Sequence, residues 1–341
     1  MVKVVKPGRR AGSVLIPSSK SIAHRELIAA ALSGGVAPIV RGESKDIIAT
    51  RNCLKAMMNG EHVWPCGESG TTLRLLEPIA GVMGFKGEFK CEGRLGTRPR
   101  MRFERKTQYV IPGNISSQFV SGLLMALPLA DYDSEIVVEG ELQSAAYVAL
   151  TEDTLKESGI NFEKQESVAR RVYSIKGNQR YRFAGGREIE GDWSQAAFFM
   201  AMGVEVDGLN HDSRQGDRAI TGLLPMIDQA EKPITIDVSQ VPDLYPCLAA
   251  YAAAKNRPVD FSGTERLRLK ESDRLASTAA MIEAVKRGKT VDAAGDHRIA
   301  MSAAMMATYG ETEVTIEGAE CVDKSYPEFW EHFEKLTIDG R

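Results

Sequence analysis

The chain repeats one local design six times along its 341 residues. In each copy, a short loop of small polar residues leads directly into a stretch rich in Ala, Leu and Met. Marker residues in successive loops are 50, 47, 77, 49 and 54 positions apart; they are Lys20, Gly70, Ser117, Ser194, Asp243 and His297. Three evenly spaced copies, one longer gap and three further copies predict two domains, each built from three units of the same motif.

Helical periodicity alternates with short β-rich runs along the chain. We expect helices at 21–33 and 273–285, and strands at 136–139, 234–238 and 314–317. This alternation predicts an α/β or α+β fold, and it disfavours an all-α or an all-β one.

The charge balance and the cysteines narrow the class of protein. There are 43 Lys and Arg residues against 46 Asp and Glu residues, a net charge of −3, whereas a protein that coats nucleic acid is expected to be basic. The five cysteines form no CxxC unit, which disfavours a zinc site or a disulfide framework. The first residues contain no apolar stretch typical of a signal peptide, and no run reaches the roughly 18–20 apolar residues of a membrane helix. We therefore expect a cytoplasmic enzyme.

Positive charge is nevertheless concentrated in and beside the repeated loops. A helix N-terminus presents unpaired N–H groups and a partial positive charge, and Arg binds carboxylate or phosphate through two hydrogen bonds. Helix capping or a surface ion pair would explain any single loop. Together, the loops predict a site for small molecules with several negative charges. The basic residues concerned are Lys20, Arg25, Arg74, Arg94, Arg98, Lys270, Arg274, Arg298 and Lys324.

Two carboxylates lie among these loops. Asp243 precedes an apolar helical stretch, and Glu271 lies between Lys270 and a Ser-Asp-Arg sequence. The first would ordinarily be a helix cap and the second an ion-pair partner, but in an anion site either one could donate or accept a proton. We expect Asp273, in the same motif, to cap the helix that follows it or to orient Arg274.

These motifs resemble those of the 5-enolpyruvylshikimate-3-phosphate synthase family. They occur in the family's order between residues 17 and 327, nearly the whole chain. The strings are Pro17-Ser18-Ser19-Lys20-Ser21-Ile22-Ala23-His24-Arg25, Gly67-Glu68-Ser69-Gly70-Thr71-Thr72-Leu73-Arg74, Arg94-Leu95-Gly96-Thr97-Arg98-Pro99, Ser116-Ser117-Gln118-Phe119, Asp243, Leu269-Lys270-Glu271-Ser272-Asp273-Arg274-Leu275, Asp296-His297-Arg298-Ile299-Ala300-Met301 and Lys324-Ser325-Tyr326-Pro327.

The resemblance implies an inside-out α/β barrel in two domains, each made of three βαβαββ units. The first domain would comprise 18–190 and the second 1–17 together with 191–341, with the active site in the cleft between them. The chain is shorter than members of the family usually are. The segments 52–66, 207–238 and 285–294 look trimmed, so some repeats could lack a strand.

The resemblance also implies a reaction. The enolpyruvyl group of phosphoenolpyruvate would pass to the 5-hydroxyl of shikimate 3-phosphate, with release of phosphate, in the shikimate pathway that supplies chorismate and the aromatic amino acids. No metal or organic cofactor is implied, because phosphoenolpyruvate brings its own leaving group. We expect the two substrates to be the binding partners of a monomer that binds neither nucleic acid nor membrane.

The same resemblance assigns roles to individual residues. Asp243 would be the base toward the 5-hydroxyl, Glu271 would protonate the methylene carbon, and Lys20 would contact both substrates. Shikimate 3-phosphate would be held by Lys20, Ser21, Arg25, Ser116, Ser117, Gln118, Ser144, Tyr147, Asp243 and Lys270. Phosphoenolpyruvate would be held by Lys20, Gly70, Arg94, Gln118, Arg274, His297, Arg298 and Lys324.

Three alternatives stay open at this point. UDP-N-acetylglucosamine enolpyruvyl transferase has the same fold and donor, but it carries Lys-Asn where this chain has Lys20-Ser21, and a reactive Cys in the loop that is here 94–99. A non-catalytic member of the fold would not be expected to keep Lys20, Asp243 and Glu271. An RNA-end-processing enzyme on a similar repeat fold would need a basic surface.

One residue departs from the family pattern close to the expected site. Glu68 stands where the family usually has Asn. A carboxylate there would repel phosphoenolpyruvate unless it pairs with an arginine.

Overall fold

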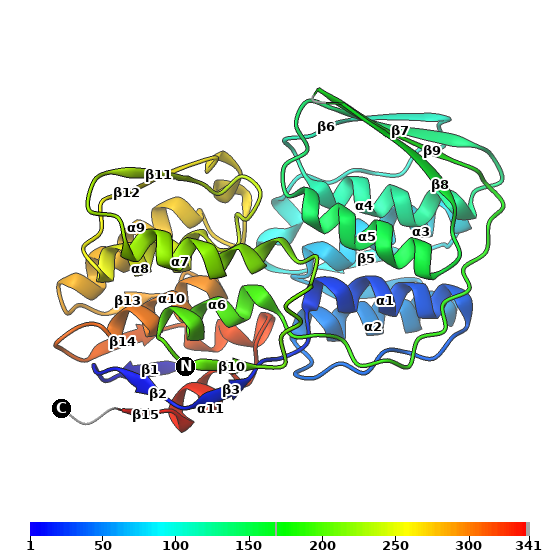
Figure 1. Cartoon of the computed structure of the whole chain (residues 1–341). Coiled ribbons are helices and arrows are strands. Elements are labelled where there is room, and N and C mark those ends of the chain that lie inside the picture. The colour runs from blue at the N-terminus through cyan, green and yellow to red at the C-terminus, as the bar shows by residue number, and fades with distance from the viewer. Residues whose placement is uncertain (168, 339–341) are drawn as a thin grey trace. The chain divides into compact units, whose positions relative to one another are not determined.

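The computed structural model describes residues 1–167 and 169–338, which fold into alternating helices and strands (Figure 1). The chain forms two compact units. Unit 1 consists of Met1–Ser19, Arg41–Ser44 and Glu190–Arg341, and unit 2 of Lys20–Val40 and Lys45–Ile189. The short segment Arg41–Ser44, which falls inside the predicted 18–190 domain, therefore groups with unit 1. The predicted 191–341 segment includes 339–341, which lie outside the described residues.

Unit 2 combines helices α1–α5 with strands β4–β9. The α-helices are α1 (Lys20–Ser33), α2 (Lys45–Met58), α3 (Gly70–Met83), α4 (Ser117–Ala126) and α5 (Ala145–Glu157), and the 3₁₀ turns are η1 (Gly93–Thr97) and η2 (Leu127–Leu129). The strands are β4 (Val63–Gly67), β5 (Glu88–Cys91), β6 (Gln108–Pro112), β7 (Ser134–Glu139), β8 (Phe162–Glu166) and β9 (Arg170–Ile175).

The helices of unit 2 form its core. Helix α3 packs on α4, α4 on α5, and α1 on both α2 and α5. Apolar residues of all five helices meet in one buried cluster. The sheet β6-β7-β9-β8 covers α3, α4 and α5 on one side (Figure 1). Helices that are buried on several sides are apolar over most of their surface, which explains the Ala- and Leu-rich stretches in the sequence.

Unit 1, like unit 2, is built from α-helices, 3₁₀ turns and short strands. Its α-helices are α6 (Trp193–Ala201), α7 (Ile220–Asp228), α8 (Tyr245–Ala254), α9 (Arg274–Lys286), α10 (His297–Ala307) and α11 (Phe329–Lys335), and its 3₁₀ turns are η3 (Gly216–Ala219), η4 (Glu265–Leu269) and η5 (Ala319–Lys324). Its strands are β1 (Val2–Val5), β2 (Arg10–Ala11), β3 (Ser13–Leu15), β10 (Glu205–Asp207), β11 (Ile234–Asp237), β12 (Val259–Ser262), β13 (Val291–Asp292), β14 (Val314–Glu317) and β15 (Thr337–Ile338).

Helix α10 is central to unit 1. It packs against α6, α8, α9 and η5, and all eleven of its residues are buried. The small sheets β1-β14-β13, β3-β10, β11-β12 and β2-β15 surround these helices. The strands predicted at 136–139, 234–238 and 314–317 and the helix predicted at 21–33 are confirmed to within two residues at each end.

A strand–helix–strand unit recurs in both halves and fixes where the polar loops lie. The parallel pairs β4-β5, β6-β7, β11-β12 and β13-β14 are each joined through one helix, namely α3, α4, α8 and α10. The repeated loops connect the first strand of each pair to that helix. The carboxyl ends of parallel strands are where α/β proteins place ligand-binding loops. The mixed α/β class predicted from the sequence is confirmed, and no helix within the described residues is both long and apolar enough to cross a membrane.

Candidate active site

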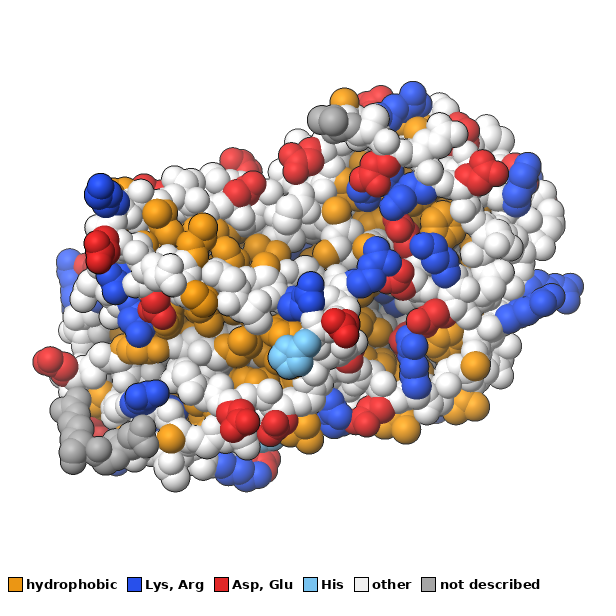
Figure 2. Space-filling view, in the orientation of Figure 1, with side chains coloured by type: hydrophobic (Ala, Val, Ile, Leu, Met, Phe, Trp, Pro, Cys, Tyr) orange, Lys and Arg blue, Asp and Glu red, His pale blue; other side chains and the backbone are white. Residues whose placement is uncertain are grey.

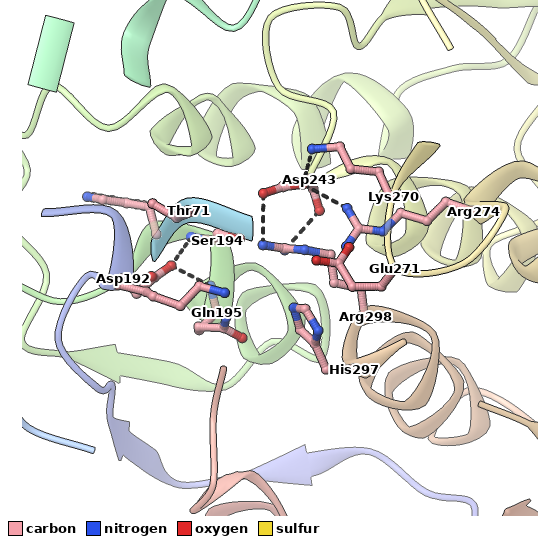
Figure 3. A network of polar contacts seen from close by, with 12 residues as sticks. Thr71, Asp192, Ser194, Gln195, Asp243, Lys270, Glu271, Arg274, His297 and Arg298 are labelled. Atoms are coloured by element: carbon pink, nitrogen blue, oxygen red, sulfur yellow. Dashed lines mark hydrogen bonds and ion pairs between the residues drawn. The ribbon is translucent and has the colours of Figure 1, made fainter. Parts of the chain in front are cut away.

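In unit 1, three cations converge on the carboxylate of Asp243 (Figure 3). Asp243 Oδ1 accepts from Arg274 Nη1 at 2.7 Å and from Lys270 Nζ at 3.3 Å. Asp243 Oδ2 accepts from Arg298 Nη2 at 3.1 Å, and Arg298 Nη1 also reaches the Asp243 backbone carbonyl at 3.0 Å. These residues come from the loop before α8, the loop after η4 and the first turns of α9 and α10. The loops marked by Asp243 and His297, which are 54 positions apart in the sequence, thus meet at one carboxylate.

The cluster changes the acidity of its members. Burial alone would raise the pKa of Asp243, but Arg298, Lys270 and Arg274 together hold it well below its usual range. Burial lowers the pKa of Lys270 to about 8, against the attraction of Asp243. Asp243 is therefore ionised at neutral pH in the free protein.

Arg274 connects this cluster to two further carboxylates. Its Nη2 donates to Glu271 Oε2 at 2.5 Å and its Nε to Asp296 Oδ2 at 2.8 Å. Asp296 is fully buried and also accepts from Ser272 Oγ at 3.1 Å. Burial would lower the pKa of Arg274, but Asp296, Glu271 and Asp243 raise it above its ordinary value. Glu271 therefore lies in direct contact with the group that also holds Asp243.

The predicted residues His297, Arg298 and Lys324 are all buried in unit 1. His297 begins α10, and its Nδ1 lies 3.9 Å from Asp296 Oδ1. Lys324 ends η5, which packs against α10. Five of the residues expected to contact phosphoenolpyruvate or the 5-hydroxyl thus lie on α9, α10, η5 and the loop before α8, and α10 packs against α8, α9 and η5.

The helix starts of unit 1 differ from the expectation that they bind anions directly. Asp192 Oδ1 accepts from the backbone N–H groups of Ser194 and Gln195 at 2.9 and 3.0 Å (Figure 3). Asp273, as predicted, caps α9 by accepting from Ala276 N at 3.3 Å, and Asp296 caps α10. Because carboxylates already occupy these N–H groups, they are not available to an incoming anion in the free protein.

In unit 2, Arg25 is fully buried but has neutral hydrogen-bond partners. Its guanidinium donates to Thr151 Oγ1 at 2.7 Å, to the Tyr147 carbonyl at 2.7 Å and to the Ser21 carbonyl at 2.6 Å. A fourth, longer contact of 3.4 Å goes to Ser121 Oγ. Burial lowers the pKa of Arg25 to about 10. Within the described residues, no carboxylate pairs with this charge, so an incoming anion would be its natural counter-ion.

Lys20 and Ser21 begin α1, one turn before Arg25. Lys20 Nζ forms an ion pair with Asp46 Oδ2 at 2.7 Å, and the Asp46 side chain is 7% exposed. Asp46 lies in the first turn of α2, so the pair joins the starts of two helices. Ser21 and Arg25 share one face of α1, as their spacing of four predicts.

Gly70 lies beneath two guanidinium groups. A β-carbon at this position would come 2.7 Å from Arg74 Nη1 and 3.3 Å from Arg98 Nη1, so only glycine fits without displacing them. Arg74 Nη1 donates to Gln118 Oε1 at 2.8 Å, and Gln118 Nε2 donates to Thr71 Oγ1 at 2.9 Å. Gly70 and Gln118 are therefore brought together by the packing of α3 on α4.

Arg94 lies exposed in η1, close to the unusual Glu68. The Glu68 carboxylate packs over Gly93, where any side chain would collide with it. Gly93 also has a φ of +54°, which favours glycine. Glu68 thus folds onto the turn that carries Arg94.

The serines predicted to hold shikimate 3-phosphate lie at the starts of α4 and α5. Ser116 caps α4 by accepting from Gln118 N at 3.3 Å, and Ser117 is its first residue. Ser144 precedes α5 in the left-handed region, with φ 56° and ψ 41°, and is 1% exposed. A non-glycine residue in this conformation is strained, and such strain is concentrated at functional sites. Tyr147 lies in the first turn of α5, and its backbone carbonyl accepts from Arg25.

Comparison with known proteins identifies the family. A family model described as EPSP synthase (3-phosphoshikimate 1-carboxyvinyltransferase) matches residues 100–333. A 3-phosphoshikimate 1-carboxyvinyltransferase of Clostridium kluyveri is 35% identical over 414 residues, which cover 97% of this chain and 96% of the relative. The chain belongs to the EPSP synthase family.

Further relatives agree with this family. The Clostridium perfringens 3-phosphoshikimate 1-carboxyvinyltransferase is 35% identical over 418 residues, with 98% of each protein covered. A structure of EPSP synthase from Acinetobacter baumannii matches with a TM-score of 0.72 at 20% identity and covers 99% of this chain, which supports the fold alone. Both sequence alignments are longer than this 341-residue chain, so the relatives contain segments that it lacks.

The sequence pattern missed the partners of the cations. Asp46, Thr151 and Ser121 each contact a predicted site residue, yet none lies in a motif that the pattern singled out. Asp296 was visible only as part of a loop string. Pairs of residues that are 26 to 126 positions apart leave no mark in spacing or composition, so only the three-dimensional structure shows them.

Within the described residues, no cluster of three His, Cys, Asp or Glu side chains is arranged to hold a metal ion.

The charged surface is mixed. On the face in Figure 2, basic and acidic side chains alternate with apolar and uncharged ones, and the described residues there form no continuous basic patch. Five of the nine cations in or beside the repeated loops are buried, namely Arg25, Arg74, Arg274, Arg298 and Lys324.

Proposed function

We propose that this protein transfers the enolpyruvyl group of phosphoenolpyruvate to the 5-hydroxyl of shikimate 3-phosphate and releases phosphate. The observation that carries the proposal is the arrangement around Asp243, whose carboxylate is held by Lys270, Arg274 and Arg298 with Glu271 on the same arginine. Two carboxylates among buried cations suit a reaction that needs anion binding together with a base and an acid.

The finer architecture is part of the same proposal. We assign each domain three βαβαββ repeats in an inside-out barrel, with domains at 18–190 and at 1–17 plus 191–341. The four strand–helix–strand units with their polar loops at the helix starts support this assignment. Residues of both domains would contact the same pair of substrates, so activity would require both.

For shikimate 3-phosphate, Arg25 and Ser21 would bind the carboxylate. The charge of Arg25, buried among neutral partners, supports this role. The phosphate would be bound by hydroxyls at the starts of α4 and α5 and by Lys270, and the substrate would lie beside Tyr147. The residues proposed for this substrate are Lys20, Ser21, Arg25, Ser116, Ser117, Gln118, Ser144, Tyr147, Asp243 and Lys270.

For phosphoenolpyruvate, the proposed ligands are again mostly cations. Gly70 would let the phosphate approach the backbone at the start of α3, beneath Arg74 and Arg98. Arg274 and Arg298 would take the carboxylate or phosphate after leaving Asp243. The residues proposed for this substrate are Lys20, Gly70, Arg94, Gln118, Arg274, His297, Arg298 and Lys324.

The reaction would then proceed by proton transfer within the cluster. As substrate anions take over the cations, the pKa of Asp243 rises and its carboxylate accepts the proton of the 5-hydroxyl. The 5-oxygen adds to C2 of phosphoenolpyruvate while Glu271 delivers a proton to C3, giving a tetrahedral intermediate. Loss of a proton from C3 to Glu271 and departure of phosphate from C2, which takes up the proton held by Asp243, then produce the enolpyruvyl ether and restore both carboxyl groups.

The deciding experiment measures inorganic phosphate when the purified protein is mixed with both substrates, and the ether product by mass spectrometry. Equimolar phosphate and product would support the proposal. Phosphate release with UDP-N-acetylglucosamine in place of shikimate 3-phosphate would favour the related transferase. Binding of both substrates without any release would favour a non-catalytic member of the family.

A further inference from the structure

Four buried polar side chains form a chain of hydrogen bonds through the apolar core of unit 2. His24 Nδ1 lies 2.7 Å from Thr50 Oγ1, which lies 2.6 Å from Thr72 Oγ1. Thr72 Oγ1 in turn donates to Ser69 Oγ at 2.7 Å. All four side chains are 0% exposed. Polar groups are costly to bury, so hydrogen bonds between buried side chains inside a core fix the relative position of the elements that carry them.

The chain connects the starts of three helices. His24 lies one turn after Lys20 on α1, Thr50 lies in the second turn of α2, and Ser69 and Thr72 belong to the start of α3. At α3, Ser69 Oγ also accepts from Thr72 N at 3.3 Å, which caps the helix immediately before Gly70. One polar chain therefore runs from the helix of Lys20 to the backbone of Gly70.

A second connection closes the network through Asp46. The Asp46 carbonyl oxygen lies 3.4 Å from Thr72 Oγ1 and 3.5 Å from Thr50 Oγ1, while the Asp46 carboxylate pairs with Lys20. Asp46 therefore contacts Lys20 through its carboxylate and lies with its backbone carbonyl beside the Thr50 and Thr72 hydroxyls.

The direction of the hydrogen bonds follows from the number of protons available. A hydroxyl donates once. With Thr72 donating to Ser69, Thr50 donates to Thr72, and His24 must donate from Nδ1 to Thr50. Thr50 and Thr72 then each accept one hydrogen bond and donate one, so removal of either hydroxyl interrupts the chain.

We propose that His24, Thr50, Thr72 and Ser69 are positioning residues that hold the Gly70 backbone in register with Lys20, and so set the affinity for phosphoenolpyruvate. The inference rests on the proposed function, in which Lys20 and Gly70 both bind this substrate. None of the four is assigned a contact with substrate; they act through the two helix starts that they join.

The test compares two Thr→Val substitutions of equal chemistry. Thr72→Val keeps the volume and β-branching but removes the central hydroxyl of the chain. Thr154→Val is the matched control, because Thr154 is also buried and its hydroxyl donates only to the Leu150 carbonyl of its own helix at 3.0 Å. The measurements are KM for each substrate, kcat and the thermal midpoint of unfolding.

We expect Thr72→Val to raise KM for phosphoenolpyruvate by about five- to tenfold, with kcat and KM for shikimate 3-phosphate changed less than about twofold. Thr154→Val should leave kcat and both KM values within about twofold of wild type. It should lower the thermal midpoint of unfolding about as much as Thr72→Val does. Equal KM values for phosphoenolpyruvate in the two variants would overturn the proposal, as would a parallel rise in both KM values.

Amide hydrogen exchange separates this inference from the proposed function. If wild type releases no phosphate, the function fails, but the network is still tested by exchange at residues 69–73. Faster exchange there in Thr72→Val and not in Thr154→Val supports the network, and equal rates overturn it. Should Thr72→Val fail to fold, Ser69→Ala removes the last acceptor of the chain, and the same readouts decide.

Discussion

Two buried arginines show how differently the two units treat positive charge. Arg274 in unit 1 is 1% exposed and contacts the carboxylates of Asp243, Glu271 and Asp296. Arg25 in unit 2 is 2% exposed and donates to hydroxyls and carbonyls. Burial lowers the pKa of Arg25, whereas in Arg274 the three carboxylates outweigh burial and raise the pKa.

The same contrast appears at the helix starts. Ser69 and Ser116 cap helices of unit 2 with neutral hydroxyls, while Asp192, Asp273 and Asp296 cap helices of unit 1 with carboxylates. Unit 1 is therefore balanced in charge before any ligand binds, and an anion must compete with its internal carboxylates. In unit 2, no carboxylate among the described residues pairs with Arg25. The proposed acid and base belong to the balanced unit, where a change of partner can shift their pKa values.

The largest expected effect concerns Glu271, which balances Arg274 and is the proposed proton donor. Glu271→Gln keeps the shape and an acceptor for Arg274 but cannot exchange a proton. We expect turnover to fall by about 10²- to 10⁴-fold, while the Kd for shikimate 3-phosphate stays within a few-fold of wild type. Phosphate-release rates and calorimetric titration measure the two quantities.

Glu283→Gln is the control for this change, since Glu283 lies on α9 and forms an exposed ion pair with Arg287. It should leave turnover unchanged. Near-normal turnover in Glu271→Gln would remove that residue from the mechanism.

The next effect tests the contrast between the two arginines directly. Arg274→Met leaves three buried or half-buried carboxylates short of a partner and should reduce the free energy of unfolding by about 3–5 kcal/mol. Arg25→Met should change it by less than about 1 kcal/mol, because no carboxylate is stranded. Thr151 Oγ1 already donates to Ser121 Oγ and lies within bonding distance of the Tyr147 carbonyl.

Arg25→Met should nevertheless weaken shikimate 3-phosphate binding by about 10- to 100-fold, the loss of a charge-assisted hydrogen bond. Urea unfolding and substrate titration of both variants give the comparison. A large loss of stability in Arg25→Met would mean that the charge of Arg25 is compensated in the free protein, and the contrast between the units would be wrong.

A smaller effect should appear in the pH dependence, through Lys270. Its pKa of about 8 lies below the ordinary value of 10.5, so the amine loses its charge as the pH rises through about 8. We expect kcat/KM for shikimate 3-phosphate to fall by up to about tenfold per pH unit above that value. Lys270→Arg keeps its charge and should flatten the profile.

The stability of the folded state should move in the opposite direction. Between the folded and unfolded pKa values of Lys270, the unfolded chain binds more protons, so this residue makes the free energy of unfolding rise with pH from about 8 to 10.5. The difference between wild type and Lys270→Arg isolates this contribution from other groups. A pH profile of kcat/KM identical in both proteins would show that Lys270 does not titrate in this range.

The sequence predicted the helix starts well because a cap or a glycine must occupy a defined position. Lys20, Gly70, Ser117 and His297 are each the first residue of a helix, and Asp273 caps α9. Such local features depend on the neighbouring backbone, which the sequence states directly. The recurrence of the motif then indicated the order of the elements.

The contacts between distant segments could not be predicted in the same way. Nothing in the spacing indicated that Lys20 pairs with Asp46, or that Arg25 is buried against Thr151. The expectation that helix starts bind anions directly also needed correction in unit 1, where Asp192 and Asp296 occupy the N–H groups. These outcomes depend on which side chains three-dimensional packing brings together, and one sequence carries no record of it.

The smallest effect compares two strained residues, one in each unit. Ser144 has φ 56° in unit 2 and Ala294 has φ 52° in unit 1. Glycine adopts this conformation freely but is more flexible when unfolded, so replacing either residue by Gly should change the free energy of unfolding by no more than about 1 kcal/mol, in the stabilising direction. Ser144→Gly should also weaken shikimate 3-phosphate binding several-fold because its hydroxyl is lost, whereas Ala294→Gly should leave binding unchanged. Equal binding in both variants would mean that the Ser144 strain positions α5 alone and that its hydroxyl does not contact the substrate.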